Sequence, residues 1–314
     1  MNEFDVIEKY FLGAMMPDYV SIGPGDDCAV FSVPEGHELC VSTDTLLAGV
    51  HFPEDAIPEV AARRAIGANL SDLAAMGAEP RGMTVALTIP SVDALWLESF
   101  AAENINLASL HQCPIVGGNL ARGQLSITIT VFGIVPRASA LTRSGARSGD
   151  FVYVSGALGA AAGAVAQLGT AQANPFLLER YESPEPRLLL GQKLRGVASS
   201  AIDLSDGLLA DLSHILKASQ LGAELNLDDV PVAEALREVF SVEEARQFAL
   251  SGGDDYELCF SVNPAHAAQI QELADYCQVA VTRIGTLSES FAGIRTVTGV
   301  ELASAGYQHF DRTN

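Results

Sequence analysis

The sequence is poor in positive charge, and this shortage excludes several classes of protein at once. Lys and Arg number 18 against 39 Asp and Glu in a chain of 314 residues, which gives a formal net charge of −21. A chain so acidic repels the phosphates of nucleic acids and the headgroups of anionic membranes. We therefore expect a protein that binds neither nucleic acid nor membrane.

Cysteine and long apolar runs are scarce as well. The five cysteines include no C-x-x-C pair, so the sequence predicts neither a disulfide framework nor a thiolate zinc site. No apolar run reaches the roughly 18 residues of a membrane-spanning helix. The first five residues carry acids where a secretory signal has a basic segment. These features predict a cytoplasmic protein.

The apolar residues are arranged for a two-domain fold of the α/β or α+β class. Hydrophobic residues make up 48% of the chain, and its length favours two domains over one. Patterns typical of strands occur at residues 38–43, 83–89, 125–135, 151–154 and 256–260, and helical patterns at 58–76, 93–110, 160–168, 208–218 and 265–276. The hydrophobic periodicity is lost between residues 136 and 150, so we expect domains at 1–137 and 138–314.

Acidic residues recur inside Gly-rich or apolar surroundings, where a solvated surface charge is not expected. The motifs are Gly-Asp-Asp-Cys-Ala-Val at 25–30, Ser-Thr-Asp-Thr at 42–45, Asn-Leu-Ser-Asp-Leu-Ala-Ala-Met-Gly-Ala at 69–78, Asp-Leu-Ser-Asp-Gly-Leu at 203–208 and Ser-Gly-Gly-Asp-Asp-Tyr-Glu-Leu at 251–258. Each has a structural alternative: Asp26 and Asp27 suit a turn, Asp206 suits a helix cap, and Asp254 suits a hairpin turn. Their joint occurrence favours a shared role.

Carboxylates that converge away from water need positive charge nearby. The chain offers only three lysines, Lys9, Lys193 and Lys217. Oxygen ligands without a His or Cys cluster select a hard cation, and Mg²⁺ is usually held by a few carboxylates together with substrate phosphates. The acidic motifs therefore indicate Mg²⁺ and a polyphosphate substrate.

The common phosphate-binding motifs are missing. The sequence has no G-x-x-x-x-G-K-[ST] and no G-x-G-x-x-G after a strand. Two other Gly-containing segments, 116–119 and 155–159, are candidate loops that bring backbone N–H groups to a phosphate. Arg143 is a candidate phosphate contact, and a solvated linker arginine is the alternative.

In this order the motifs resemble the thiamine-monophosphate kinase family, which belongs to the superfamily of aminoimidazole ribonucleotide synthetase and selenophosphate synthetase. The resemblance runs from about residue 3 to residue 310. It implies a two-domain α/β (α+β) fold of the aminoimidazole ribonucleotide synthetase type and a homodimer that pairs through its N-terminal domains. It also implies ATP-dependent, Mg²⁺-dependent phosphorylation of thiamine monophosphate to thiamine diphosphate.

The resemblance also assigns site residues. Positions matching Mg²⁺ ligands are Asp27, Ser42, Thr43, Asp44, Asp72, Asn119, Asp203 and Asp206. Positions matching ATP contacts are Gly118, Asn119, Arg143 and Ser205. Positions matching thiamine monophosphate contacts are His51, Asp254 and a C-terminal aromatic residue, Phe310 or Tyr307.

The chain departs from the family pattern at two positions. Asn119 stands where the family usually has Asp, so we expect weaker binding of one Mg²⁺, because an amide carries no charge. Asp254 stands where Glu is common and keeps the carboxylate. No catalytic base is expected, because the acceptor is itself a phosphate, whose second pKa lies at about 6.

Two other functions stay open at this stage. One is an ATP-dependent synthetase of the same superfamily that acts on another acceptor. His51 and the lack of a reactive N-terminal Cys loop argue against it. The other is a non-catalytic cation-binding module, although no D-x-[DN]-x-[DN]-G-x₅-E calcium loop is present.

Overall fold

The computed structural model describes residues 6, 9–10, 16–24, 26–170, 172–304 and 306–307. The chain divides into two compact units. The first comprises residues 1–73 and 78–138, and the second comprises residues 74–77 and 139–314. Over the part of the chain that is described, no helix is both long and apolar enough to cross a membrane.

The first unit contains a four-stranded sheet in the order β3-β6-β4-β5. Its strands are β3 (His37–Leu47), β6 (Ser126–Pro136), β4 (Glu79–Ile89) and β5 (Ile115–Arg122). The β3–β6 and β6–β4 pairs are antiparallel, and the β4–β5 pair is parallel. The short strands β1 (Val20–Ile22) and β2 (Val30–Phe31) form a separate antiparallel pair.

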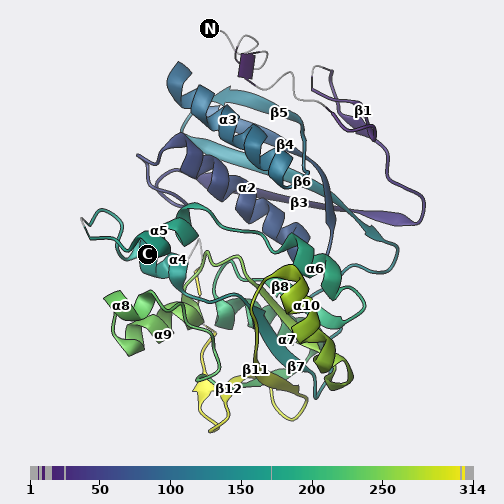
Figure 1. Cartoon of the computed structure of the whole chain (residues 1–314), viewed down its shortest axis with the longest axis vertical. Helices are drawn as coiled ribbons and strands as arrows, with labels where there is room; N and C mark the ends of the chain where they lie inside the picture. The colour runs from purple at the N-terminus through teal and green to yellow at the C-terminus, as the bar shows by residue number, and fades with distance from the viewer. Residues whose placement is uncertain are drawn as a thin grey trace. The chain divides into compact units, whose positions relative to one another are not determined.

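Two helices cover one face of this sheet, α2 (Pro58–Ala75) and α3 (Ala94–Leu110) (Figure 1). Alternate residues of β6 are buried, among them Ile127 and Ile129, as expected for a sheet with one covered face. Arg63 on α2 contacts Glu103 on α3, with Nε and Oε1 2.6 Å apart. Asp93 caps α3, because its side chain accepts from two amides of the first turn.

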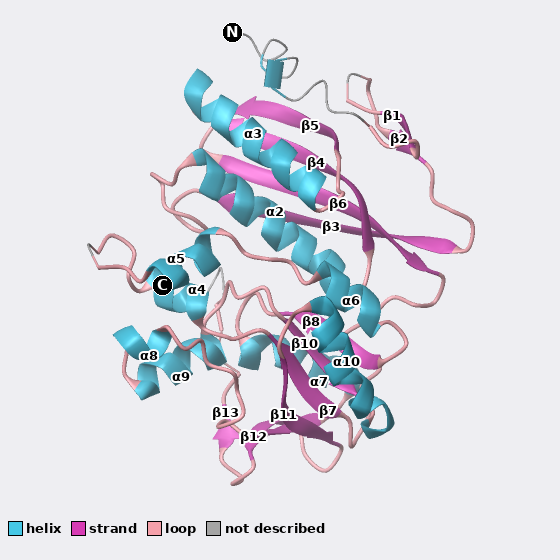
Figure 2. Cartoon of the chain, viewed as in Figure 1, coloured by secondary structure: helices cyan, strands magenta, loops and turns pink. Residues whose placement is uncertain are grey.

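The second unit is built on a seven-stranded sheet in the order β13-β12-β9-β11-β7-β10-β8. Its strands are β7 (Phe151–Ser155), β8 (Ala198–Asp203), β9 (Gly222–Leu225), β10 (Leu258–Val262), β11 (Val281–Ser288), β12 (Gly293–Thr296) and β13 (Glu301–Leu302). The β12–β9 pair is parallel and the other pairs are antiparallel. The unit is therefore a mixed sheet with connecting helices (Figure 2).

The helices of the second unit contribute to three apolar clusters, two of which also include strands of the sheet. These helices are α4 (Ala160–Val165), α5 (Pro175–Glu182), α6 (Leu188–Leu194), α7 (Leu208–Ser219), α8 (Leu236–Val239), α9 (Val242–Ser251) and α10 (Ala267–Cys277), with a 3₁₀ turn at Pro264–His266. On β7, Val152 and Val154 belong to the core cluster that includes α7. Tyr153 between them belongs to the cluster that includes α6 and α10. The period of two along the strand thus separates two apolar cores.

The strands and helices expected from the sequence are present, with ends shifted by a few residues. One expectation was wrong: the candidate phosphate loop at 116–119 lies inside strand β5, which pairs with β4. A Cβ atom on Gly118 would lie only 2.0 Å from the carbonyl oxygen of Val85. The glycine therefore permits the close approach of two strands. From the sequence alone, a Gly-Gly pair in such a strand looks the same as one in a loop.

A buried ion network fixes the start of β10 to its neighbours in the second unit. The carboxylate of Glu257, which is 1% exposed, accepts from Arg187 on both of its oxygens. Arg180 on α5 donates to it at 2.9 Å, and the Ser155 hydroxyl at the end of β7 donates at 2.5 Å. Two guanidinium groups and a hydroxyl thus compensate the desolvation of one carboxylate.

We predict that Glu257→Gln lowers the free energy of unfolding by about 3 to 5 kcal/mol, because it removes the buried counter-ion of Arg187 and leaves only Glu185, which is 62% exposed. The matched control is Glu224→Gln, which removes the partner of Arg295 in a pair whose side chains are 38% and 37% exposed. That change is expected to cost about 1 kcal/mol or less. Urea denaturation of both variants measures the difference, and equal losses would contradict the prediction.

Candidate functional site

In the first unit, three of the predicted metal ligands lie on the face of the sheet that α2 covers. Ser42 and Asp44 are two residues apart on β3, so their side chains share one face. The Ser42 hydroxyl donates to Asp72 Oδ2 on α2 at 2.5 Å. The Asp44 amide donates to Asn69 Oδ1, one helical turn before Asp72, at 3.0 Å. The strand and the helix thus bring Ser42, Asp44 and Asp72 together.

Two other predicted ligands do not join this group through their side chains. The Thr43 hydroxyl lies on the opposite face of β3, 2.9 Å from the hydroxyl of Thr130 on β6. Asn119 on β5 pairs with Ala86, and the register across β4 and β6 puts Asn119 on that same face. A shift of one residue along a strand changes the face, so Thr43 and Asn119 are separated from Asp44 by the sheet.

His51 and Asp27 also lie in the first unit, on turns. The His51 ring accepts the Leu47 amide at Nδ1, 3.0 Å away, and the buried Arg64 donates from Nε to the His51 carbonyl oxygen at 2.8 Å. The first bond orients the ring, and the second holds the backbone of the turn. Asp27 is exposed, and its amide donates to Asp26 Oδ1 at 2.8 Å, which is the local turn bonding that its sequence favours.

In the second unit, backbone hydrogen bonds join the two acidic loops. The amide of Asp254 donates to the Ser205 carbonyl at 2.8 Å, and the amide of Tyr256 donates to the Leu204 carbonyl at 2.9 Å. Asp203, at the end of β8, pairs with the first residue of β10 in the antiparallel register. The structure therefore brings together residues that lie about fifty positions apart in the sequence.

The same loop receives Tyr307, whose amide donates to the Asp206 carbonyl at 3.2 Å. Asp203, Ser205, Asp206, Asp254 and Tyr307 thus form one group in the second unit. Phe310, the other aromatic candidate, lies outside the described residues. Arg143 is exposed, and its backbone carbonyl oxygen accepts from the Ser219 hydroxyl at 3.3 Å. This bond does not connect Arg143 to the acidic group.

Asp211 supports this group, and sequence reasoning missed it. It lies in the first turn of α7, is 3% exposed, and accepts the amides of Asp206 and Gly207 at 3.0 and 3.1 Å. Burial raises the pKa of the Asp211 carboxyl group to about 7, and the neighbouring charges of Asp203 and Asp206 add to this effect. The sequence signal that could have revealed it is an acidic residue on the leucine-rich face of helix α7.

Asp255 also has a role that the sequence did not reveal. Its Oδ2 accepts the Gly159 amide at 2.7 Å, just before α4. Burial is the main cause that raises the pKa of the Asp255 carboxyl group to about 8. The Gly159 amide of the candidate phosphate loop at 155–159 is therefore bonded to a carboxylate of the protein itself.

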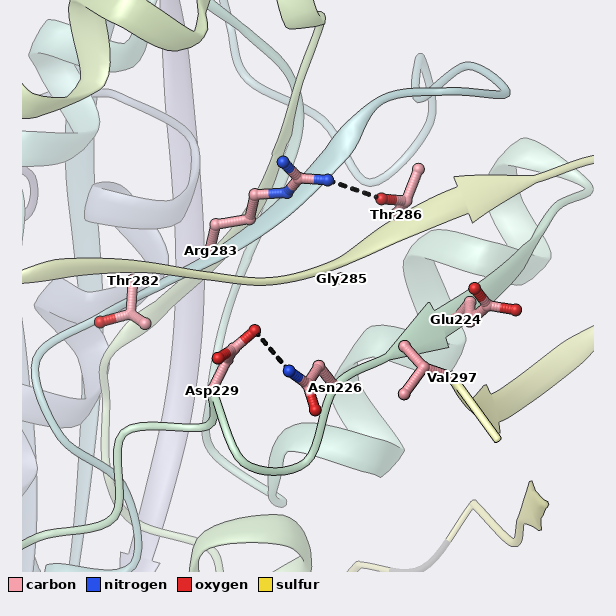
Figure 3. Close-up of a pocket in the computed structure, with 8 residues that line it drawn as sticks. All are labelled: Glu224, Asn226, Asp229, Thr282, Arg283, Gly285, Thr286 and Val297. Carbon is pink, nitrogen blue, oxygen red and sulfur yellow. Dashed lines mark hydrogen bonds between the residues drawn. The ribbon is translucent and has the colours of Figure 1, made fainter. Parts of the chain in front are cut away.

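A pocket of about 490 Å³ lies elsewhere in the second unit (Figure 3). Its lining residues are Glu224, Asn226, Asp229, Thr282, Arg283, Gly285, Thr286 and Val297. None of the predicted site residues that the structure describes lines it. Four of its side chains bond in two pairs, Asn226 to Asp229 and Arg283 to Thr286. The acidic groups, one in each unit, are therefore the candidate sites rather than this pocket.

The candidate sites offer oxygen donors from carboxylates, hydroxyls and backbone carbonyls. Within the described ranges, no group of three or more His, Cys, Asp or Glu side chains is arranged to hold a metal ion. The oxygen donors present suit a hard cation only when oxygens of a bound ligand complete its coordination.

Two family descriptions match most of the chain. Residues 25–135 match "AIR synthase related protein, N-terminal domain", and residues 147–297 match "AIR synthase related protein, C-terminal domain". The two-domain fold expected from the sequence, with mixed helix and sheet content, is therefore confirmed.

Individual proteins are similar over nearly the whole length. The chain is 44% identical to the thiamine-monophosphate kinase of Escherichia coli (strain K12) over 320 residues, which covers 98% of each protein. The crystal structure of thiamine-monophosphate kinase from Stenotrophomonas maltophilia K279a matches with a TM-score of 0.86 at 39% identity, over 91% of this chain and 93% of that one. A structure of AaThiL complexed with AMPPCP and TMP matches with a TM-score of 0.80 at 28% identity, over 89% of each chain. The chain belongs to the thiamine-monophosphate kinase family.

Proposed function

We propose that this protein transfers the γ-phosphoryl group of ATP to the phosphate of thiamine monophosphate and so forms thiamine diphosphate and ADP. The observation that carries the proposal is the group Asp203, Ser205, Asp206 and Asp254, assembled by backbone hydrogen bonds in a chain of this family. The relative from Escherichia coli is named for this kinase activity, and AaThiL was solved with AMPPCP and TMP. An acidic group of this kind suits phosphate ligands that arrive with cations.

The oxygen donors fit Mg²⁺, which is commonly bound by one or two carboxylates together with substrate phosphates. In the first unit the Ser42 hydroxyl and the Asp72 carboxylate are in contact. The residues proposed to hold Mg²⁺ are Asp27, Ser42, Thr43, Asp44, Asp72, Asn119, Asp203 and Asp206. When bound, Mg²⁺ neutralises negative charge on the phosphates that must approach each other.

The remaining site residues bind and orient the two substrates. The proposed ATP contacts are Gly118, Asn119, Arg143 and Ser205, and the proposed thiamine monophosphate contacts are His51, Asp254 and either Tyr307 or Phe310. The ring of His51 accepts one hydrogen bond from the Leu47 amide, and Arg64 holds its backbone carbonyl, so substrate binding has less side-chain entropy to remove. The carboxylate of Asp254 suits the cationic thiazolium ring or the amino group of thiamine.

The transfer needs no protein base. A phosphate oxygen of thiamine monophosphate forms the new bond to the γ-phosphorus, and the bond from that phosphorus to the bridging oxygen of ADP breaks. The acceptor is largely dianionic at neutral pH, because the second pKa of a phosphate monoester is about 6. The residues of the chain therefore position the two anions and compensate their charge, which is the main contribution of a protein to phosphoryl transfer.

The proposal extends to assembly and location. We assign residues 1–137 to cation and ATP binding and to dimerisation, and residues 138–314 to a C-terminal α/β domain. A homodimer is supported by the open face of the first sheet, where Leu39 is 45% and Val41 54% exposed, since apolar side chains on an open face mark interaction surfaces. All five cysteines are free thiols, in keeping with a cytoplasmic protein.

We predict that purified protein incubated with ATP, Mg²⁺ and thiamine monophosphate forms thiamine diphosphate, and that free thiamine gives no product. A chelator is expected to abolish the reaction, because the phosphates then repel each other. Chromatographic separation of thiamine, its monophosphate and its diphosphate provides the measurement. Folded protein that binds ATP yet forms no product from either acceptor would instead favour a synthetase acting on another acceptor.

We predict that Asp72→Asn lowers turnover by about 100-fold, because the Mg²⁺ that Asp72 is proposed to hold would supply electrostatic stabilisation of this order in the transition state. The melting temperature is expected to stay near that of the wild type, because Asp72 is only half-buried and an amide can still accept from Ser42. The control is Asp228→Asn, an exposed acid outside the candidate sites. An Asp72→Asn variant with normal turnover would refute the assignment.

We predict that Asn119→Asp lowers the Mg²⁺ concentration needed for half-maximal activity, because it restores a charge at a family ligand position. The measurement is a Mg²⁺ titration of the initial rate, with the wild type as reference. An unchanged Mg²⁺ requirement would remove Asn119 from the proposed set of ligands. Asn119 would then have no role in Mg²⁺ binding, in agreement with its place on the sheet face opposite Asp44.

A further inference from the structure

The segment between α9 and β10 holds its backbone in an unusual conformation. Six described residues other than glycine have positive φ, and two of them, Asp254 at 68° and Tyr256 at 50°, lie in this segment. Asp tolerates the left-handed region, whereas a bulky residue such as Tyr rarely adopts it. Backbone strain of this kind persists only where the surrounding structure fixes it, and it is common at functional sites.

Contacts on two sides fix the segment. The amides of Asp254 and Tyr256 donate to the carbonyls of the Asp206-containing loop, at Ser205 and Leu204. Between them, the Asp255 carboxylate turns the other way and accepts the Gly159 amide at 2.7 Å. The alternation of these contacts along three consecutive residues holds the left-handed backbone in place.

This conformation brings the side chains of Asp254 and Tyr256 together. The Tyr256 hydroxyl donates to Asp254 Oδ1 at 3.1 Å. Tyr256 is 9% exposed, so its ring is held by packing and its hydroxyl has a fixed position. A carboxylate that accepts from a fixed hydroxyl has fewer accessible rotamers than one in water. Tyr256 therefore restricts the direction in which Asp254 points.

We propose that Tyr256 is a positioning residue, which orients the Asp254 carboxylate for thiamine monophosphate through its hydroxyl. The proposal rests on the proposed function, in which Asp254 contacts this substrate. It predicts a selective effect, because the ATP contacts are assigned to other residues. Loss of the hydroxyl leaves Asp254 in place but disordered, and the substrate must then order it on binding.

The experiment compares Tyr256→Phe with wild type in steady-state kinetics. The KM for thiamine monophosphate is expected to rise about tenfold, the range for a hydrogen bond to a charged group, while the KM for ATP and kcat stay unchanged. An effect on KM alone marks lost binding rather than lost transition-state stabilisation. The matched control is Tyr276→Phe, which removes a hydroxyl from a 63% exposed tyrosine on α10 and is expected to behave as wild type.

A double-mutant cycle separates positioning from a general structural role. Asp254→Ala is expected to raise the KM for thiamine monophosphate, and adding Tyr256→Phe to that variant is expected to have no further effect. A residue that acts only through Asp254 shows this coupling, whereas independent effects add.

An unchanged KM for thiamine monophosphate in Tyr256→Phe would overturn the proposal, and so would additive effects of the two substitutions. A similar rise in both KM values would do so as well, since it indicates a general structural change. Failure of the proposed function would show in a different experiment, the wild-type assay, as a lack of thiamine diphosphate. In that case the positioning role of Tyr256 would be ruled out as well.

Discussion

The desolvated carboxylate of Glu257 is the constraint on which the arrangement of the second unit depends. It is paired with Arg187 and Arg180 and accepts from Ser155, so it fixes α5, the start of α6 and the end of β7 relative to the start of β10. A buried charge of this kind is tolerated only with all its partners present. The loop that carries Asp254 directly precedes Glu257, so the contacts of Glu257 hold one end of that loop in place.

The two acidic groups are assembled by different means. In the first unit, regular structure suffices, because alternation along β3 and one turn of α2 bring Ser42, Asp44 and Asp72 to the same face. In the second unit, irregular loops are joined by backbone hydrogen bonds. The buried acids Asp211 and Asp255 accept from loop amides, at Asp206 and Gly159 respectively. The strained backbone at Asp254 and Tyr256 costs stability, which the contacts around these loops must offset.

Much of the fold followed from local pattern, and the misses have identifiable causes. Strand β6 was expected close to its observed bounds, because its alternation reflects one covered face. Helix α2 is buried over most of its length, and its bounds were expected from an Ala-rich segment followed by Gly77 and Pro80. The Gly117-Gly118 pair was assigned to a loop, because the close approach of β5 to β4 that requires glycine is a tertiary contact. Asp211 and Asp255 were not assigned roles, because their partners, the amides of Gly207 and Gly159, are not distinguishable in a sequence.

The sequence by itself determined the class of protein and the kind of chemistry. Its shortage of lysine and its acidic motifs indicated oxygen ligands, a hard cation and phosphates, and the order of the motifs carried the resemblance that implied a two-domain fold of this family. Only the tertiary structure decided which acids meet. It placed Asn119 on the face of the sheet opposite Asp44, and it brought Asp254 to Ser205 and under the hydroxyl of Tyr256. Strand register and long-range hydrogen bonds set these relations, and both depend on how distant segments pair.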